Sequence, residues 1–441
     1  MQANPYKIDF KKFMESDHAT DFSNNDHRSK AFKRFLSGGF PTRKDEDWRF
    51  TDISELSQVH YQYSVDRSIR KPLIERELKR HLIPGCLPIV IYNGVIDKKH
   101  SAIKDLPPEI EINSRSDSSP AIFTMPFSQN NYFNNRLQGS AFYNWNTAFS
   151  DIGLQIEVNG NQFENDSFIQ LLFISSPSAR NTVYHYHNIF HVHQNSQLKI
   201  LEYYLNTQND DYLVNGVTEI IMDDNSSAQH ILFQQDSNAA KHVHTNRIQQ
   251  KKDSQLTSHQ MNFGGKFNRN EQRILMEGPG GSISLYGLNL ANAQQQMDSN
   301  IIVDHAQPHT SSRQIYKNIL SDKAHGVFNG LVVVEKEAQH TDAKQTNRNL
   351  LMSDAALMNS NPQMEIYADD VLCAHGSTTG ELDEDALYYI QTRGIDKATA
   401  INLLVKGFAA EVIDTITEAG IRSACTNLLD HYLAKNTAYN Q

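Results

Sequence analysis

A cysteine and a histidine two residues apart, Cys373 and His375, are the residues of this sequence that best suit metal chemistry. If residues 371–376 are extended, side chains two positions apart lie on the same face of the strand. A thiolate and an imidazole are both suitable ligands for iron or zinc. Two ligands do not complete a four-ligand site. The spacing therefore leaves two interpretations: part of a metal site whose other ligands come from another chain, or a buried cysteine beside an incidental histidine.

Three His-x-His pairs lie nearer the N-terminus and form a second candidate metal site. In a strand, both histidines of a pair lie on one face, as they do in cupin-type sites. A cupin site also needs a carboxylate and a further histidine at set separations, and we find no persuasive set. We therefore predict that the histidines are structural, with a stand-alone metal-binding β-protein as the alternative. The pairs are His185 and His187, His191 and His193, and His242 and His244.

The motifs of self-contained enzymes are missing from the sequence. It contains no GxxxxGK[ST] phosphate loop, no GxSxG nucleophile turn and no HExxH zinc helix. Its acidic clusters, Asp369-Asp370 and Asp383-Glu384-Asp385, are typical of turns and helix caps rather than of paired catalytic carboxylates. We expect a protein that is not an enzyme.

The composition excludes further classes of partner. The formal net charge of −10 over 441 residues opposes binding to nucleic acid or to an anionic membrane. No run approaches about 18 consecutive apolar residues, the length that a membrane-spanning helix needs. The N-terminal residues show no secretion signal. Three widely separated cysteines without a CxxC fit a reducing compartment, so we expect a cytoplasmic protein.

Three zones follow one another along the chain. Residues 1–130 are predicted to form a mostly helical domain and a linker, with a strand and turn at 87–96. Residues 131–378 carry many short strand-like runs, whose centres lie roughly 12 to 16 residues apart in the clearer half, which allows a sandwich or a solenoid. Polar residues inside these runs weakly favour a β-helix. The runs are 168–174, 198–205, 217–222, 231–234, 273–276, 282–290, 301–303 and 327–334.

Residues 379–441 are predicted to form a helical C-terminal domain. Asp383 is a good N-cap for a first helix that ends near Arg393, and Asp396 is a good N-cap for a second. A third helix follows around residues 421–433. Three helices after a long β region would either cover its end or bind a partner.

Three segments of the sequence resemble the SufB/SufD family of iron–sulfur cluster assembly scaffold proteins. The first, residues 41–51, includes Pro41, Glu46 and Trp48 in the pattern of the family's N-terminal signature. The second covers residues 340–354. The third covers residues 362–395 and includes Cys373-Ala-His375-Gly376. This last motif resembles the SufD branch of the family, whereas the SufB branch has V-x-H-E-A here and usually more cysteines.

The resemblance implies a fold, a role and partners. The fold would be a right-handed parallel β-helix flanked by N-terminal and C-terminal helical domains. The chain would be a scaffold that pairs with a SufB-like subunit, and a SufC-like ATPase would bind the C-terminal helices. Transient iron or a nascent cluster would assemble at the SufB-like interface, with His375 and Cys373 among its ligands. The residues expected near the ATPase are Asp383, Leu387, Arg393 and Phe408.

The resemblance leaves several alternatives open. A reduced flavin can occur in the full complex of the family, but no motif here indicates a flavin site, and we expect no cofactor on the isolated chain. A SufB-like paralogue is the nearest alternative, and a cytosolic carbohydrate-active β-helix is a more distant one. An exposed β-helix edge would also allow the isolated chain to form a homodimer.

Overall fold

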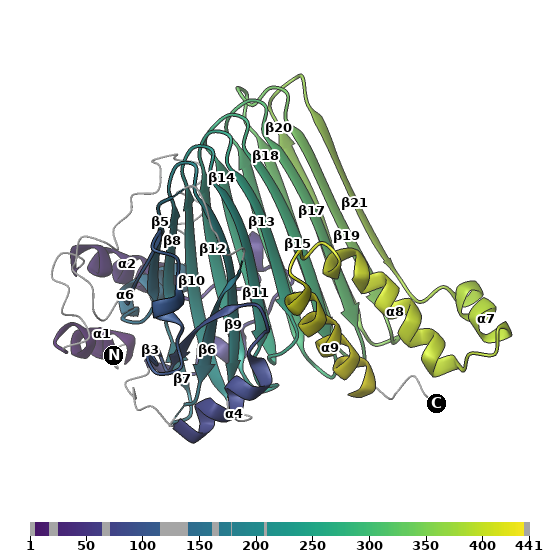
Figure 1. Cartoon of the computed structure of the whole chain (residues 1–441), viewed down its shortest axis with the longest axis horizontal. Coiled ribbons are helices and arrows are strands. Elements are labelled where there is room, and N and C mark those ends of the chain that lie inside the picture. The colour runs from purple at the N-terminus through teal and green to yellow at the C-terminus, as the bar shows by residue number, and fades with distance from the viewer. Residues whose placement is uncertain are drawn as a thin grey trace.

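The predicted strands stack into a parallel β-helix, as the computed structural model of the chain shows (Figure 1). The structure describes residues 5–16, 25–63, 71–114, 140–160, 167–177, 179–206 and 210–435. Part of the predicted linker, residues 115–130, lies outside these ranges, and so do the last six residues of the predicted C-terminal domain. Within the described part, no helix has the length and apolar character needed to cross a membrane.

Two sheets form the β-helix, and from β8 to β21 successive strands alternate between them. In sheet A the order is β20 (Leu357–Ile366), β18 (His325–Val334), β16 (Gln296–His305), β14 (Phe267–Met276), β12 (Lys241–Gln250), β10 (Tyr212–Met222), β8 (His187–Val192), β5 (Leu154–Val158) and β4 (Ile110–Ser114), with β7 (Thr182–Tyr184) beside β10 and β1 (Gln62–Tyr63) beside β7. In sheet B it is β21 (Leu372–Gly380), β19 (Asp342–Leu351), β17 (Ser311–Leu320), β15 (Ser282–Ala291), β13 (Gln255–Asn262), β11 (Ser227–Gln235), β9 (Gln197–Asn206), β6 (Ile169–Ser175), β2 (Leu87–Tyr92) and β3 (Val95–Ile96).

The coils of the β-helix differ in length, which explains why the sequence shows no letter-for-letter repeat. Lys241 pairs with Phe267, 26 residues later, whereas His325 pairs with Leu357, 32 residues later. The strands keep their register and the turns take up the difference. The strand and turn expected at 87–96 are confirmed as β2 and β3, and β2 pairs with β6 in sheet B.

Polar side chains line up from coil to coil, as expected for a β-helix. The amide of Asn262 donates to the side-chain oxygen of Asn289 at 2.6 Å, and that of Asn289 donates to Asn318 at 2.7 Å. Asn318 donates in turn to Asn349 at 2.6 Å. All four are buried, and each lies opposite the next in the strand register. This asparagine ladder satisfies polar groups that would otherwise be costly to bury.

Helices cover both sheets and leave one end open (Figure 1). Aromatic residues of the N-terminal helices pack against sheet A at the N-terminal end, and α8 and α9 pack against sheet B. The helices are α1 (Pro5–Met14), α2 (Asn25–Gly38), α3 (Ser54–Gln58), α4 (Lys71–His81), α6 (Ala141–Phe149), α7 (Glu384–Thr392), α8 (Lys397–Ile413) and α9 (Ala419–Lys435), with 3₁₀ turns η3 (Glu46–Trp48) and η4 (Ile103–Asp105).

Candidate functional site

Cys373 and His375 lie on β21, the last strand of sheet B. Cys373 is opposite Ala343 of β19, and His375 is opposite Gln345. Ala343 and Gln345 are buried, whereas Lys344 between them is exposed. Side chains that are opposite one another in a parallel ladder point to the same face of the sheet. Cys373 and His375 therefore continue the inner face of the β-helix at the coil where it ends.

The two side chains differ in their surroundings. Cys373 is half-buried and packs against a small apolar cluster that includes Val332 and Ala343, whereas His375 is exposed. Burial is the main cause that raises the pKa of the Cys373 thiol. The thiol is therefore protonated at neutral pH in the isolated chain, and a metal ion that binds its sulfur must displace the proton. The imidazole of His375 is accessible from solvent.

Within the described part of the chain, the Cys373–His375 pair does not form a complete metal site. Among the described residues, three metal-binding side chains do lie within reach of one ion, but at another place. They are Glu157, His191 and His193. Four ligands are the usual number for zinc or for an iron–sulfur cluster iron. A metal ion or cluster at Cys373 and His375 would therefore need ligands from outside the described chain.

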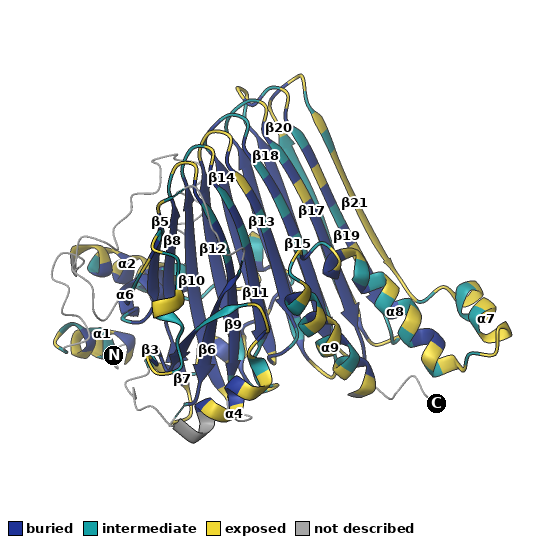
Figure 2. Cartoon of the chain, viewed as in Figure 1, coloured by how far each residue is buried: buried dark blue, intermediate teal, exposed yellow. Residues whose placement is uncertain are grey.

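The open end of the β-helix is the part of sheet B where exposed residues gather, as Figure 2 shows along β21. Along β21 nearly every residue is exposed, whereas the central strands of both sheets are almost wholly buried. Most of the large apolar residues that are exposed in the described chain lie on β20, β21, α7 and α8 or between them. They are Leu357, Ile366, Tyr367, Leu372, Tyr388, Tyr389 and Leu403. Exposed large apolar residues that gather on a few elements at one end of a molecule are a feature of interaction surfaces.

Comparison with known protein families settles which family has this architecture. The model described as the SUF system FeS cluster assembly SufBD core domain matches residues 173–408, which is more than half of the chain. The model of the SufBD protein N-terminal region matches residues 9–171. The chain belongs to the SufBD family. The resemblance seen in the sequence is thus confirmed, and the core model runs from β6 to α8.

Three relatives of the chain match it over most of their length. An iron–sulfur cluster assembly SufBD family protein of Synechocystis sp. is 29% identical over 395 residues, 87% of this chain and 85% of that protein. The iron–sulfur cluster assembly protein SufD of Escherichia coli is 24% identical over 392 residues, 88% of each chain. The chloroplastic protein ABCI7 of Arabidopsis thaliana is 28% identical over 91% of this chain and 84% of that protein.

In this SufBD chain, the four residues expected near an ATPase have different surroundings. Asp383 is the N-cap of α7, because its carboxylate accepts from the backbone N–H groups of Asp385 and Ala386. Leu387 and Phe408 are partly buried against the helices and sheet B. Arg393 is the exposed C-cap residue of α7, and its guanidinium donates to the hydroxyl of Tyr389 at 3.0 Å.

Sequence reasoning missed the more exposed residues of the same helices. Tyr388 and Tyr389 of α7 are 71% and 60% exposed, and Leu403 of α8 is 47% exposed. The two adjacent tyrosines of residues 384–392 were the available signal, because neighbouring residues of a helix point in different directions and a narrow core-facing stripe does not bury both. In Figure 1, α7 lies beyond the last strand and away from the rest of the molecule.

The His-x-His pairs of this chain differ in burial and in their neighbours. His185, His242 and His244 are buried, and desolvation lowers the pKa of His185 and of His244 to about 3. His185 contacts the ring of Trp145, and His242 lies 2.7 Å from Asp236, so these are packed core residues. The pair His191 and His193 differs, because both rings lie beside carboxylates near the surface.

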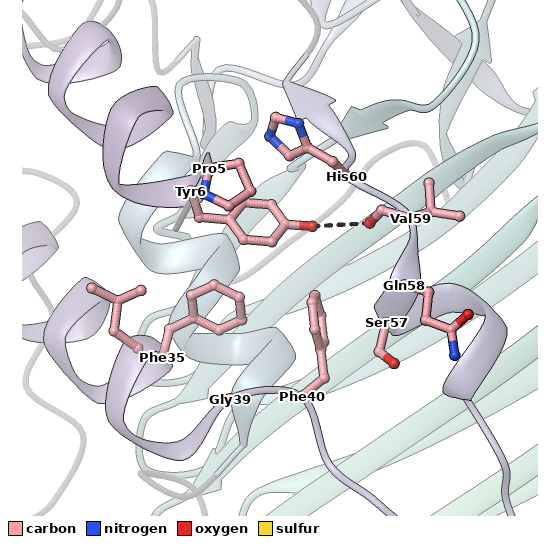
Figure 3. Close-up of a pocket in the computed structure, with 10 residues that line it drawn as sticks. Pro5, Tyr6, Phe35, Gly39, Phe40, Ser57, Gln58, Val59 and His60 are labelled. Carbon is pink, nitrogen blue, oxygen red and sulfur yellow. Dashed lines mark hydrogen bonds between the residues drawn. The ribbon is translucent and has the colours of Figure 1, made fainter. Parts of the chain in front are cut away.

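A pocket between α1, α2 and residues 57–60 lies near the N-terminus (Figure 3). Its volume is about 400 Å³, and aromatic side chains such as Phe35 and Phe40 contribute to its lining. The hydroxyl of Tyr6 donates to the backbone oxygen of Val59 at 3.2 Å, and His60 lies 2.6 Å from Asp9. These polar groups already bind within the chain, so they offer a ligand little specific recognition.

Proposed function

We propose that this chain is the SufD-type scaffold subunit of a SUF iron–sulfur cluster assembly complex and has no catalytic activity of its own. In this proposal it pairs with a SufB-like subunit through the open end of the β-helix and receives a SufC-like ATPase at its C-terminal helices. The observation that carries the proposal is the position of Cys373 and His375, an incomplete ligand pair on an exposed terminal strand. The name of the Escherichia coli relative gives it further support.

The terminal strand offers a partner two kinds of contact. Among the described strands β21 pairs with β19 alone, so its outer N–H and C=O groups are available to a strand of the partner. Exposed apolar side chains such as Leu372, which is 71% exposed, would be buried by the same contact. A partner with a similar open edge would thus cover both kinds of surface at once.

The iron or nascent cluster is the cargo of the complex in this proposal. A partner strand beside β21 would bring its own side chains towards Cys373 and His375 and could complete a four-ligand set. His375 is the more accessible ligand, since it is exposed and needs no change in packing. Cys373 would contribute its sulfur once the metal ion displaces the proton from the thiol.

The C-terminal helices would receive the ATPase. The described helices α8 and α9 are fixed on sheet B through a buried apolar cluster that includes Val405, Val412 and Leu429. The exposed rings of Tyr388 and Tyr389 on α7 lie outside that cluster. A movement of the ATPase would be transmitted to the strands that α8 contacts, including β17, because Lys317 of β17 donates to the backbone oxygen of Phe408 at 2.7 Å.

A cytoplasmic location belongs to the same proposal. Cys86, Cys373 and Cys425 are all free thiols in the structure. Free thiols and oxygen-sensitive cluster assembly both fit a reducing compartment.

The test is co-purification of the full chain with SufB-like and SufC-like partners, followed by cluster reconstitution measured by visible absorption. We expect the wild-type chain to retain both partners and His375→Ala to retain them while cluster yield falls at least tenfold. The control is His309→Asn, an exposed histidine with positive φ between β16 and β17, where asparagine is tolerated. Unchanged cluster yield in His375→Ala would exclude the ligand role, and absence of both partners would exclude the scaffold role.

A further inference from the structure

A second group of metal-type ligands lies at the other end of the β-helix from Cys373 and His375. It consists of Glu157, His191, His193 and Asp223, which we call the histidine–carboxylate cluster. Glu157 is on β5, His191 is on β8 and His193 follows β8, and Asp223 follows β10. In Figure 1, β5 and β8 lie at one end of the sheets and β21 at the other. The two sites are therefore separate.

The strand register brings the cluster together on the outer face of sheet A. Glu157 is opposite His191, and Val192 is opposite Met222. Val192 and Met222 belong to the interior core, so their neighbours in the sequence point outward. The pattern His-x-His puts two rings side by side on this face, and the adjacent strands supply one carboxylate on each side.

The distances within the cluster are short enough for its side chains to bind one metal ion. Oε2 of Glu157 lies 3.1 Å from Nδ1 of His191 and 2.7 Å from Nε2 of His193. One ligand atom from each of these three residues lies within 4.8 Å of the other two. Two imidazole nitrogens and one carboxylate oxygen form the donor set of open-sided sites for Zn²⁺ and for non-haem Fe²⁺. Two nitrogen donors disfavour Ca²⁺ and Mg²⁺, which prefer oxygen.

Asp223 contacts the other nitrogen of each ring. Its Oδ2 lies 2.9 Å from Nε2 of His191 and 3.6 Å from Nδ1 of His193. A carboxylate in this position fixes the orientation of a metal-binding histidine and makes its free nitrogen a better ligand. The ammonium of Lys251 donates to Oδ1 of Asp223 at 2.7 Å, on the carboxylate oxygen that does not face the histidines.

The cluster is held firmly and is still accessible. The amide of Gln155 donates to Oε1 of Glu157 at 2.6 Å, which leaves Oε2 directed at the histidines. The side chains of His193 and Glu157 are 32% and 23% exposed, whereas that of His191 is 11% exposed. An ion could enter from the His193 side and retain water or another ligand there.

We propose that Glu157, His191 and His193 form a resident binding site for one divalent first-row transition ion, Zn²⁺ or Fe²⁺, with Asp223 as the positioning residue. Unlike the pair at Cys373 and His375, this ligand set comes from one chain and needs no partner. The ion would tie β5, β8 and the end of β10 together at the N-terminal end of the β-helix.

The test is titration of the metal-free full chain with Co²⁺, whose d–d absorption reports nitrogen and oxygen coordination, followed by displacement with Zn²⁺. We expect one equivalent to bind in the wild type. His193→Asn and Glu157→Gln should each weaken binding at least 100-fold, and Asp223→Asn should weaken it 10- to 100-fold. His375→Ala should bind as the wild type does, which separates this site from the proposed cargo site.

The matched control is His340→Asn, which removes a histidine that pairs with a single carboxylate, that of Asp370, at 3.0 Å. It should leave Co²⁺ binding unchanged. Because His193 and Glu157 are partly exposed, their variants should fold, and circular dichroism with and without Zn²⁺ checks this. Zn²⁺ should raise the melting temperature of the wild type and of the two control variants, and it should not raise that of His193→Asn or Glu157→Gln. The proposal is overturned if the wild type takes up no stoichiometric Co²⁺, or if both His193→Asn and Glu157→Gln bind it as the wild type does.

Discussion

The guanidinium of Arg269 lies 3.8 Å from the ring centroid of Trp48, and this contact fastens the N-terminal segment to the β-helix. Arg269 is fully buried on β14 and forms ion pairs with Asp298 and Glu271. Its Nη2 also donates to the backbone oxygen of Asp47 at 3.2 Å. Trp48 belongs to the family-like segment 41–51, and that segment therefore has a structural role, because it covers a buried charge.

Replacement of this arginine tests the arrangement. Arg269→Met should lower the free energy of unfolding by about 3–5 kcal/mol, because it leaves the carboxylates of Asp298 and Glu271 buried without their cation. Urea denaturation followed by circular dichroism measures the change. Lys266→Ala is the control, since the Lys266–Glu55 pair is at the surface and should contribute less than about 1 kcal/mol. Equal stability of the two variants would contradict this account.

Asp304 should make stability depend on pH. Both of its carboxylate oxygens are buried without a hydrogen-bond partner in the described structure, and desolvation, with Glu335 nearby, raises its pKa to about 7. Between about pH 4 and 7 the folded chain therefore holds a proton that the unfolded chain has lost. Stability should fall as pH rises through this range, by up to roughly 1.4 kcal/mol per pH unit, and stay low above it.

Asp304→Asn removes this titration. The variant should unfold at a higher urea concentration than the wild type at pH 8, and its advantage should shrink towards pH 5. Measurement of both chains at several pH values between 4 and 8 gives the difference in slope. If the unfolding free energies of the two chains changed in parallel with pH, Asp304 would not be the cause of the pH dependence.

The outer edge of β21 should be required for pairing with a partner. The backbone N–H of Leu372 donates to Thr341 of the preceding turn, and successive amides of a strand alternate in direction, so the N–H of Ser377 points away from β19. Ser377→Pro should keep the ladder to β19 but remove an outer donor and add bulk. We expect normal folding and at least tenfold weaker binding of the SufB-like subunit in a pull-down titration. Thr378→Ala, on the next residue, should bind normally, and undiminished binding by Ser377→Pro would exclude this edge.

The rings of α7 should matter for the ATPase. A double variant, Tyr388→Ser and Tyr389→Ser, should bind the SufC-like subunit at least tenfold more weakly, because the exposed rings supply the apolar area. Its stability should change by less than about 1 kcal/mol, since neither ring is buried. Ile8→Ser, which replaces a 48% exposed side chain on α1, is the control for loss of an exposed apolar group elsewhere. A normal affinity in the double variant would place the ATPase on another surface.

The sequence predicted the strands with continuous apolar character and missed those with polar interiors. The run 217–222 is confirmed within β10, and 282–290 within β15. The strand β12 escaped prediction because its buried positions include His242, His244 and Asn246. Such residues fit the interior because neighbouring coils supply partners, as Thr218 of β10 does for His244, and the order of residues along the chain does not show which partners these are.

The candidate sites show the same limit. The argument for Cys373 and His375 assumed an extended segment, which β21 provides, and their place on the inner face at the last coil follows only from the register with β19. Glu157 and Asp223 lie 34 residues before and 32 residues after His191. No carboxylate at a characteristic separation marked that group, because the coil length that brings these residues together varies along the chain.

The asparagine ladder has a direction. Each amide donates towards the C-terminal coil, from Asn262 through Asn289 and Asn318 to Asn349, whose own amide donates to Oγ1 of Thr379 at 3.1 Å. Aligned bonds polarise one another, so the row behaves as a single electric dipole along the axis of the solenoid. Its final rung is the hydroxyl of Thr379, which accepts from Asn349 and has a proton of its own to donate. A second subunit with a hydrogen-bond acceptor beside the Thr379 hydroxyl would therefore extend the row of aligned bonds across the interface. A donor at the same place would be repelled by the hydroxyl proton.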